Sequence, residues 1–170
     1  MAAPRVPSVG YLVWHLSLQW RVAVDRALNP LGLTHPHYAL LASLYALTRG
    51  GARPSQRELA DFSGLEVMYV SKLVRPLERS GLLRRKDHPD DPRAFQLELT
   101  ATGTDLITKA AVVVGQLYDQ LLAPIGGRTS KRTGALMQVL QTLLDHAQAD
   151  RRRGTRSAAG ETAARKRRIR

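Results

Sequence analysis

The sequence has 170 residues and no cysteine, and its 26 Lys and Arg against 14 Asp and Glu give a formal net charge of +12. The lack of cysteine excludes disulfides, thiolate zinc sites and cysteine-based redox sensing within this chain. No apolar run approaches the roughly 20 residues of a membrane span, and the N-terminus lacks the pattern of a signal peptide. We therefore expect a cytoplasmic protein of one domain, with no part in the membrane.

The positive charge is concentrated near the C-terminus. Residues 151–170 hold nine basic residues and one acidic residue, a net +8, so residues 1–150 carry only +4. This segment also has few apolar side chains with which to offset the entropy cost of ordering. We expect a domain over residues 8–150 and a basic disordered tail over 151–170. The tail is either simply solvated or adds nonspecific affinity for nucleic acid phosphates.

Two helices are predicted in the first fifty residues. Apolar residues at three- and four-residue steps indicate a first amphipathic helix that ends near residues 29–32. Thr34 or His35 can cap the second helix, which the pair Gly50 and Gly51 ends.

Residues 55–80 have the pattern of a helix-turn-helix. The stretch SQRE at 55–58 is a capping box, in which the serine hydroxyl accepts from the N3 amide and the glutamate accepts from the cap amide. Gly64 then permits a tight turn, and another helix follows from about residue 66 to residue 80. Two helices joined by three or four residues with glycine in the turn are typical of this DNA-binding motif.

The second helix of this motif has two faces. Its predicted buried face consists of Val70, Leu73, Val74 and Leu77. The side chains left outward or at the edge are Val67, Met68, Tyr69, Ser71, Lys72 and Arg75. Such a face suits a DNA major groove, because cations and a hydroxyl bind phosphates or guanine edges while Val67 or Met68 can contact a thymine methyl. The alternative is a surface helix of an ordinary bundle. Pro76 is expected to kink this helix.

A β-hairpin is predicted over residues 82–99. The strands are LLRRK and the alternating AFQLELT, and the loop between them is DHPDDPR. In a winged helix, the loop of such a hairpin lies over the minor groove beside the recognition helix. Arg93 is the expected minor-groove probe, since a narrow groove concentrates negative potential, and Asp91 can orient it through a bidentate pair. The alternative is an intraloop salt bridge of little energetic weight. Arg84 is expected on the same surface.

Two further helices follow the hairpin. Thr100 can cap a long helix over 101–122, which Pro124 ends, and a last helix over about 129–149 carries a leucine stripe at 136–144. The sequence thus predicts six helices, with the hairpin between the fourth and the fifth.

Four motifs in this order resemble the MarR family of winged helix-turn-helix regulators. They are Ser55-Gln56 with Leu59-Ala60, VSKLVRPLERSGLLRR, DDPRA and LTATG. The resemblance implies a mainly α fold with a small β-hairpin wing, whose terminal helices form a dimerisation region. It also implies a homodimer that presents two recognition helices to successive major grooves of a pseudo-palindromic operator, roughly 34 Å apart.

The resemblance assigns roles to single residues of this chain. Asp91 and Arg93 become the wing pair, and the expected phosphate or base contacts are Ser71, Lys72 and Arg75. Ser55 and Gln56 place a helix N-terminus on the DNA backbone.

Regulators of the MarR family often release DNA when a small aromatic acid or lipophile enters a crevice beside the dimerisation helices. The residues that could border such a crevice are Trp14, His15, Trp20, His37, Tyr38 and Tyr45. The alternative is that these are core and interface aromatics. His35 and His37 are interpreted as cap and surface residues rather than metal ligands, so we expect no metal and no cofactor. No nucleophile–base pair or phosphate-binding glycine loop indicates an enzyme.

The leading interpretation is a sequence-specific DNA-binding transcriptional regulator, more specifically a repressor, with a possible small-molecule effector. The alternative is a nonspecific nucleic-acid or chromosome-associated winged-helix protein that relies on its basic tail. An adaptor that uses a winged helix without DNA is disfavoured by the cations Arg84, Arg85 and Arg93, which are expected to line one surface.

Overall fold

The computed structural model describes the backbone of residues 7–87 and 95–168, and the side chains as far as residue 149. The chain divides into two compact units, Met1–Tyr118 and Asp119–Arg170. None of the helices in the described residues is long and apolar enough to cross a membrane.

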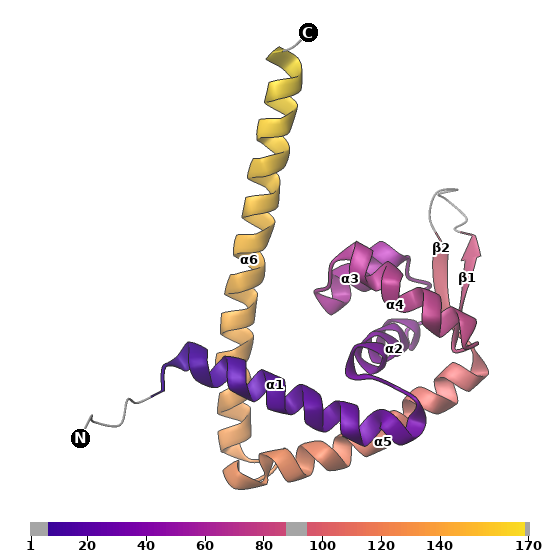
Figure 1. Ribbon diagram of the computed structural model, residues 1–170, viewed down its shortest axis with the longest axis vertical. Helices are drawn as coiled ribbons and strands as arrows, with labels where there is room; N and C mark the ends of the chain where they lie inside the picture. The colour runs from indigo at the N-terminus through magenta and orange to yellow at the C-terminus, as the bar shows by residue number, and fades with distance from the viewer. Residues whose placement is uncertain (1–6, 88–94, 169–170) are drawn as a thin grey trace. The chain divides into compact units, whose positions relative to one another are not determined.

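The described residues contain six α-helices and one two-stranded antiparallel sheet (Figure 1). In chain order the elements are α1 (Val9–Leu28), α2 (His35–Thr48), α3 (Gln56–Ser63), α4 (Val67–Arg79), β1 (Leu83–Asp87), β2 (Phe95–Leu99), α5 (Ala101–Leu122) and α6 (Lys131–Arg168). Short 3-10 turns follow α1 and α5. The predicted order of four helices, a hairpin and two helices is confirmed, and α5 has the predicted bounds.

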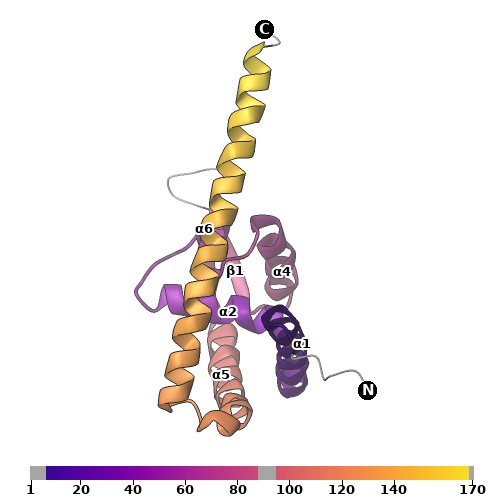
Figure 2. The ribbon, with the colours of Figure 1, turned by 90° about the vertical axis from the view of Figure 1, so that its left-hand side faces the viewer.

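Aliphatic side chains form the core of the first unit, as the composition predicts. The buried members are Val24, Leu28, Leu33, Leu40, Leu41, Leu44, Leu59, Ala60, Val70, Leu73, Val74, Leu77, Leu82, Leu83, Leu97, Ile107, Ala110 and Val114. They come from every helix of this unit and from both strands, with α2 near the centre. In both views α4 lies next to α2 (Figures 1 and 2), and β2 is the strand that contacts α2. The helix-turn-helix and the hairpin are therefore fixed to one common core.

The start of α2 is held by α1 rather than by its own cap. Thr34 occupies the N-cap position, but its hydroxyl makes no cap hydrogen bond and instead lies 3.1 Å from Nδ1 of His37. The backbone N–H of His35 donates to Oδ1 of Asp25 on α1, at 2.6 Å. A carboxylate at a helix N-terminus also interacts favourably with the helix dipole. Asp25 thus joins α1 to α2.

Only the C-terminal part of α1 contributes to this core. Val24 and Leu28 are buried, whereas the apolar side chains of the first turns are exposed to solvent in the single chain. The exposed members are Val9, Tyr11, Leu12, Val13, Trp14, Leu16 and Leu18. Apolar side chains this numerous on a helix normally pack against another element.

Gly103 lets α5 approach the end of the hairpin closely. A Cβ atom at this position would overlap the backbone carbonyl oxygen of Leu82. Oγ1 of Thr100 accepts from the N–H of Gly103 at 3.0 Å and donates to the carbonyl of Gly81 at 2.6 Å. The LTATG motif therefore has a physical basis: its threonine caps α5, as predicted, and its glycine makes the close contact possible.

In the second unit, α6 starts at Lys131 and continues to Arg168, whereas the sequence predicts a last helix that ends near residue 149. Alanine, arginine and lysine are frequent beyond residue 150 and have high helix propensity, which accounts for the longer helix. The leucine stripe at 136–144 is exposed in the single chain. The division into a domain over 8–150 and a separate basic tail stays a prediction.

Candidate nucleic-acid interface

The capping box at the start of α3 is present in full. The N–H of Glu58 donates to Oγ of Ser55 at 3.2 Å, and the N–H of Ser55 donates to Oε2 of Glu58 at 2.7 Å. Gly64 ends α3 in the left-handed conformation, with φ of 68°. Since a side chain at that φ is strained, glycine is the residue that suits the turn. α4 then starts after only three residues, which is the spacing predicted for the helix-turn-helix.

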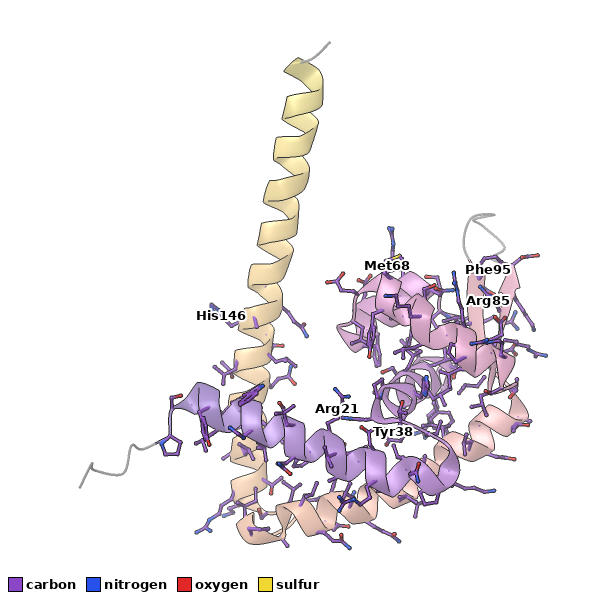
Figure 3. The ribbon with its side chains drawn as sticks, viewed as in Figure 1. Arg21, Tyr38, Met68, Arg85, Phe95 and His146 are labelled. Atoms are coloured by element: carbon purple, nitrogen blue, oxygen red, sulfur yellow. The ribbon has the colours of Figure 1, made fainter. Side chains whose placement is uncertain are left out.

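α4 has the buried face that its periodicity predicts, made of Val70, Leu73, Val74 and Leu77. The opposite side of the helix carries four exposed residues at steps of four, three and four: Met68, Lys72, Arg75 and Arg79. We call these four residues the outer stripe. Val67 and Tyr69 flank its first turn and are exposed, and Ser71 is half-buried. Figure 3 shows Met68 at the outer edge of the α3–α4 pair.

Pro76 does not end α4. The helix continues through it to Arg79, and the N–H of Ser80 donates to the carbonyl of Pro76 at 3.0 Å. Met68, Lys72 and Arg75 all precede the proline, so three of the four residues of the outer stripe lie on the uninterrupted part of the helix.

The hairpin is attached to the start of α3. The strands pair with Arg84 opposite Glu98 and Arg85 opposite Leu97. The N–H of Leu97 donates to the carbonyl of Pro54 at 2.8 Å, and Ser55 and Gln96 form an isolated antiparallel bridge. The segment just before α3 therefore pairs with β2 over a short distance, on the side of β2 that faces away from β1.

Two cations on β1 share one carboxylate on β2. Nε of Arg84 lies 2.9 Å and Nζ of Lys86 lies 2.8 Å from Oε2 of Glu98. Hydrogen bonds from Arg84 and then from Lys86 lower the pKa of Glu98 from its ordinary value of 4.5 to about 2. Arg84 is exposed, but a phosphate that binds it has to compete with this carboxylate.

The opposite face of the hairpin is joined to α4 by Arg85. The expectation that Arg84 and Arg85 line one surface is therefore wrong, because consecutive side chains of a strand point to opposite faces. Its guanidinium contacts Glu78 of α4 through Nη2 at 2.6 Å and through Nε at 2.8 Å, both to Oε2. The guanidinium also lies over the ring of Phe95, 5.4 Å from its centroid, and Figure 3 shows Arg85 beside Phe95. The hydrogen bond from Arg85 is the main cause of a lowered pKa for Glu78. Arg85 thus joins the hairpin to the helix.

The predicted site residues and the residues that form this surface are not the same set. Asp91 and Arg93 lie outside the described residues. Ser55 and Gln56 are half-buried at the start of α3. Sequence reasoning did not select the exposed cations Arg53, Arg57, Arg79 and Lys86, or the carboxylates Glu78 and Glu98. Glu98 could be selected only once the register of β1 against β2 is known, because its partners lie across the hairpin.

The aromatic residues proposed for an effector pocket contact different neighbours. His15 lies 4.6 Å from Trp14 and 4.1 Å from Tyr11 between ring centroids, on the exposed part of α1. Trp20 lies 5.2 Å from Tyr118. Burial, and to a smaller extent the neighbouring Tyr118, raise the pKa of Tyr38. The guanidinium of Arg49 lies over the ring of Tyr45, 5.9 Å from its centroid. Nδ1 of His37 lies 3.1 Å from the hydroxyl of Thr34. Among the described residues, no group of three or more acidic or histidine side chains could hold a metal ion.

Known proteins are similar to this chain both in sequence and in fold. The family model described as MarR family matches residues 33–95, which span α2 to the first residue of β2. The uncharacterized HTH-type transcriptional regulator YdcH of Bacillus subtilis is 33% identical over 139 residues, 82% of this chain and 91% of YdcH. The chain belongs to the MarR family. It is thus a DNA-binding transcriptional regulator with a winged helix-turn-helix, a member of a family of regulators rather than enzymes.

Solved structures of MarR-family proteins have the same fold. The M. tuberculosis transcriptional regulator MOSR, in complex with DNA, is similar with a TM-score of 0.71 and 25% identity, covering 85% of this chain and 99% of that one. The transcriptional repressor CouR, bound to a 23-mer DNA duplex, has a TM-score of 0.71 and 25% identity, covering 81% of this chain and 92% of that one. In this MarR-family chain α4 is accordingly the recognition helix and the hairpin is the wing.

Proposed function

We propose that this protein is a sequence-specific repressor that binds a pseudo-palindromic operator as a homodimer. The observation that carries the proposal is the outer stripe of α4, in which an apolar side chain is followed by three cations on the face opposite the core. A recognition helix docks with its N-terminal residues at the base edges, so the cations behind them can bind phosphates. MOSR and CouR, both solved with DNA, support the same use of this fold, and CouR is described as a repressor.

The proposed DNA contacts extend from α4 to its neighbours. They comprise Ser55, Gln56, Val67, Met68, Tyr69, Ser71, Lys72, Arg75, Arg84, Asp91 and Arg93. To these we add Arg53, Arg57, Arg79 and Lys86, because all four are exposed cations on α4, on the wing, on α3 or in the segment just before α3. Arg85 is left out because Glu78 and Phe95 occupy its guanidinium.

Exposed apolar side chains support the homodimer. The apolar side chains in the first turns of α1 and the leucine stripe of α6 are exposed in the single chain. A second copy of the chain would bury them, and two winged helices related by a two-fold axis match two half-sites of a palindrome. The partner of such a dimer is chromosomal DNA, so we infer a cytoplasmic location.

A small aromatic or lipophilic effector is part of the proposal. Trp14 is exposed, and Tyr38 and Tyr45 are half-buried beside the core, so apolar side chains are available to a ligand. Binding of such a ligand would have to favour a dimer geometry that fits the operator poorly.

The experiment has two steps. Fragments bound by the full chain are selected from random DNA, and the enriched sequence is footprinted. A two-fold symmetric footprint with half-sites one helical turn apart is expected, and a footprint without symmetry contradicts the proposal. Affinity is then compared with that of residues 1–150 across a salt series. If specific binding persists with a shallower salt dependence, the basic tail only adds phosphate contacts. If all affinity disappears, the nonspecific nucleic-acid protein is the better interpretation.

A further inference from the structure

The first turn of α4 differs chemically from the rest of the outer stripe. Met68 is 72% exposed, which is the highest value for any large apolar side chain among the described residues. Val67 and Tyr69 beside it are 41% and 42% exposed. The three cations of the stripe follow only from Lys72 onward. The helix therefore presents an apolar end first and positive charge behind it.

An apolar end limits what the recognition helix can read. In the major groove, the only methyl group displayed by the four standard bases is the C5-methyl of thymine, while most other groups at the base edges are hydrogen-bond donors and acceptors. Methionine and valine cannot satisfy such polar edges, but they can bury a methyl group. Methionine is suited to this because its unbranched thioether chain adapts to the shape of its partner.

We propose that Met68, flanked by Val67, recognises thymine methyl groups in each half-site of the operator. This inference rests on the proposed function, and it adds the chemistry by which bases are distinguished. Lys72, Arg75 and Arg79, at the following positions of the same stripe, supply the complementary charge for the phosphates on either side of the groove. The occupant of this apolar surface is thus the thymine edge of duplex DNA.

The test removes the methyl group without changing base pairing. Each thymine of the selected operator is replaced in turn by deoxyuracil, and dissociation constants are measured for the full chain. Loss of a buried methyl weakens binding about fourfold, given about 0.8 kcal/mol per buried methylene and tenfold per 1.4 kcal/mol. We expect a loss of this size at one or two thymines of each half-site. For Met68→Ala, the same replacements should have no further effect.

Two matched variants separate recognition from general affinity. Met68→Leu keeps an apolar side chain and should keep the preference for thymine over deoxyuracil. Lys72→Ala should weaken binding equally to the operator with thymine and to the operator with deoxyuracil. It should also reduce the salt dependence of binding, because the partner of Lys72 is a phosphate. Because Met68 is exposed, the thermal unfolding temperature of Met68→Ala should match that of the unchanged protein. A matching temperature shows that a loss of affinity in this variant does not come from a loss of folding.

The outcomes distinguish this inference from the function on which it rests. If specific operators are bound but deoxyuracil is tolerated everywhere, thymine recognition is wrong and the repressor proposal stands. Equal methyl sensitivity in Met68→Ala and in the unchanged chain assigns the methyl contact to another residue and also overturns the inference. If no specific sequence is enriched, both proposals fail.

Discussion

Arg85 of β1 is anchored to Glu78 of α4, with Nη2 2.6 Å and Nε 2.8 Å from the same carboxylate oxygen, and its guanidinium covers Phe95 at the start of β2. One arginine therefore connects the recognition helix to both strands of the wing. Since Leu97 also bonds to the segment before α3, the wing is held at two points of the helix-turn-helix. These contacts hold the wing against the helix-turn-helix in the chain itself.

Glu78→Gln should loosen this attachment. The pair is partly exposed to solvent, so we expect a loss of about 0.5–1 kcal/mol in the free energy of unfolding, measured by urea titration. Arg85→Gln should cost more, because it also removes the contact with Phe95. The double variant should cost no more than Arg85→Gln alone, because the pair with Glu78 is already lost in that single variant. Additive costs would contradict a direct coupling of the two side chains.

Glu98 should make stability depend on pH on the acid side. Its folded-state pKa of about 2 lies below the ordinary value of 4.5, so its contribution is complete above pH 4.5 and is lost as pH falls to about 2. In urea titrations at pH 6 to 2, the difference in stability between the unchanged chain and Glu98→Gln should shrink across this window. A difference that stays constant would contradict the ion pairs, and added salt should reduce it at neutral pH.

Gly103→Ala should destabilise the junction of wing and α5. The new methyl group would overlap the carbonyl oxygen of Leu82, so backbone has to move, and we expect a loss of about 3 kcal/mol in the free energy of unfolding. Gly10→Ala is the matched control, because nothing lies within 4 Å of the added atom in α1. In that variant stability should stay the same or rise by up to about 1 kcal/mol. Equal effects of the two variants would contradict the close approach.

Local sequence signals predicted the helix-turn-helix well. The buried face of α4 depends only on the helical period, and the caps at Ser55 and Thr100 depend on side chains within three residues of the helix start. Such features need no knowledge of distant parts of the chain.

Contacts between elements could not be predicted in the same way. Both strands of the wing were predicted, but a sequence does not fix their register, so the pairing of Arg84 and Lys86 with Glu98 was missed. The contact of Asp25 with the N–H of His35 depends on how α1 packs against α2. The apolar pattern of α1 predicted a helix, but it did not indicate that only Val24 and Leu28 are buried within the chain.

Arg93→Ala should weaken operator binding by about 1–3 kcal/mol without changing thermal unfolding, if this residue is the minor-groove probe of the wing. The measurement is a fluorescence anisotropy titration with the selected operator. Arg85→Lys is a useful comparison, because it keeps the charge of the wing and changes the contacts of the guanidinium with Glu78 and Phe95. An unchanged affinity for Arg93→Ala would contradict the proposed role of the wing.

Leu140→Arg should convert the proposed dimer into a monomer. Leu140 is 47% exposed in the single chain and lies in the leucine stripe of α6, so a charge there would be buried without a partner if two copies pack through this stripe. Light scattering after size-exclusion chromatography at micromolar concentration gives the mass directly. Gln138→Arg is the control, since it adds the same charge on the opposite face of the same helix and should leave the mass of a dimer. Two half-sites can be bound together only by linked protomers, so Leu140→Arg should also lose operator affinity much more than Gln138→Arg. A dimeric mass for both variants would mean that the leucine stripe of α6 is not the dimer contact.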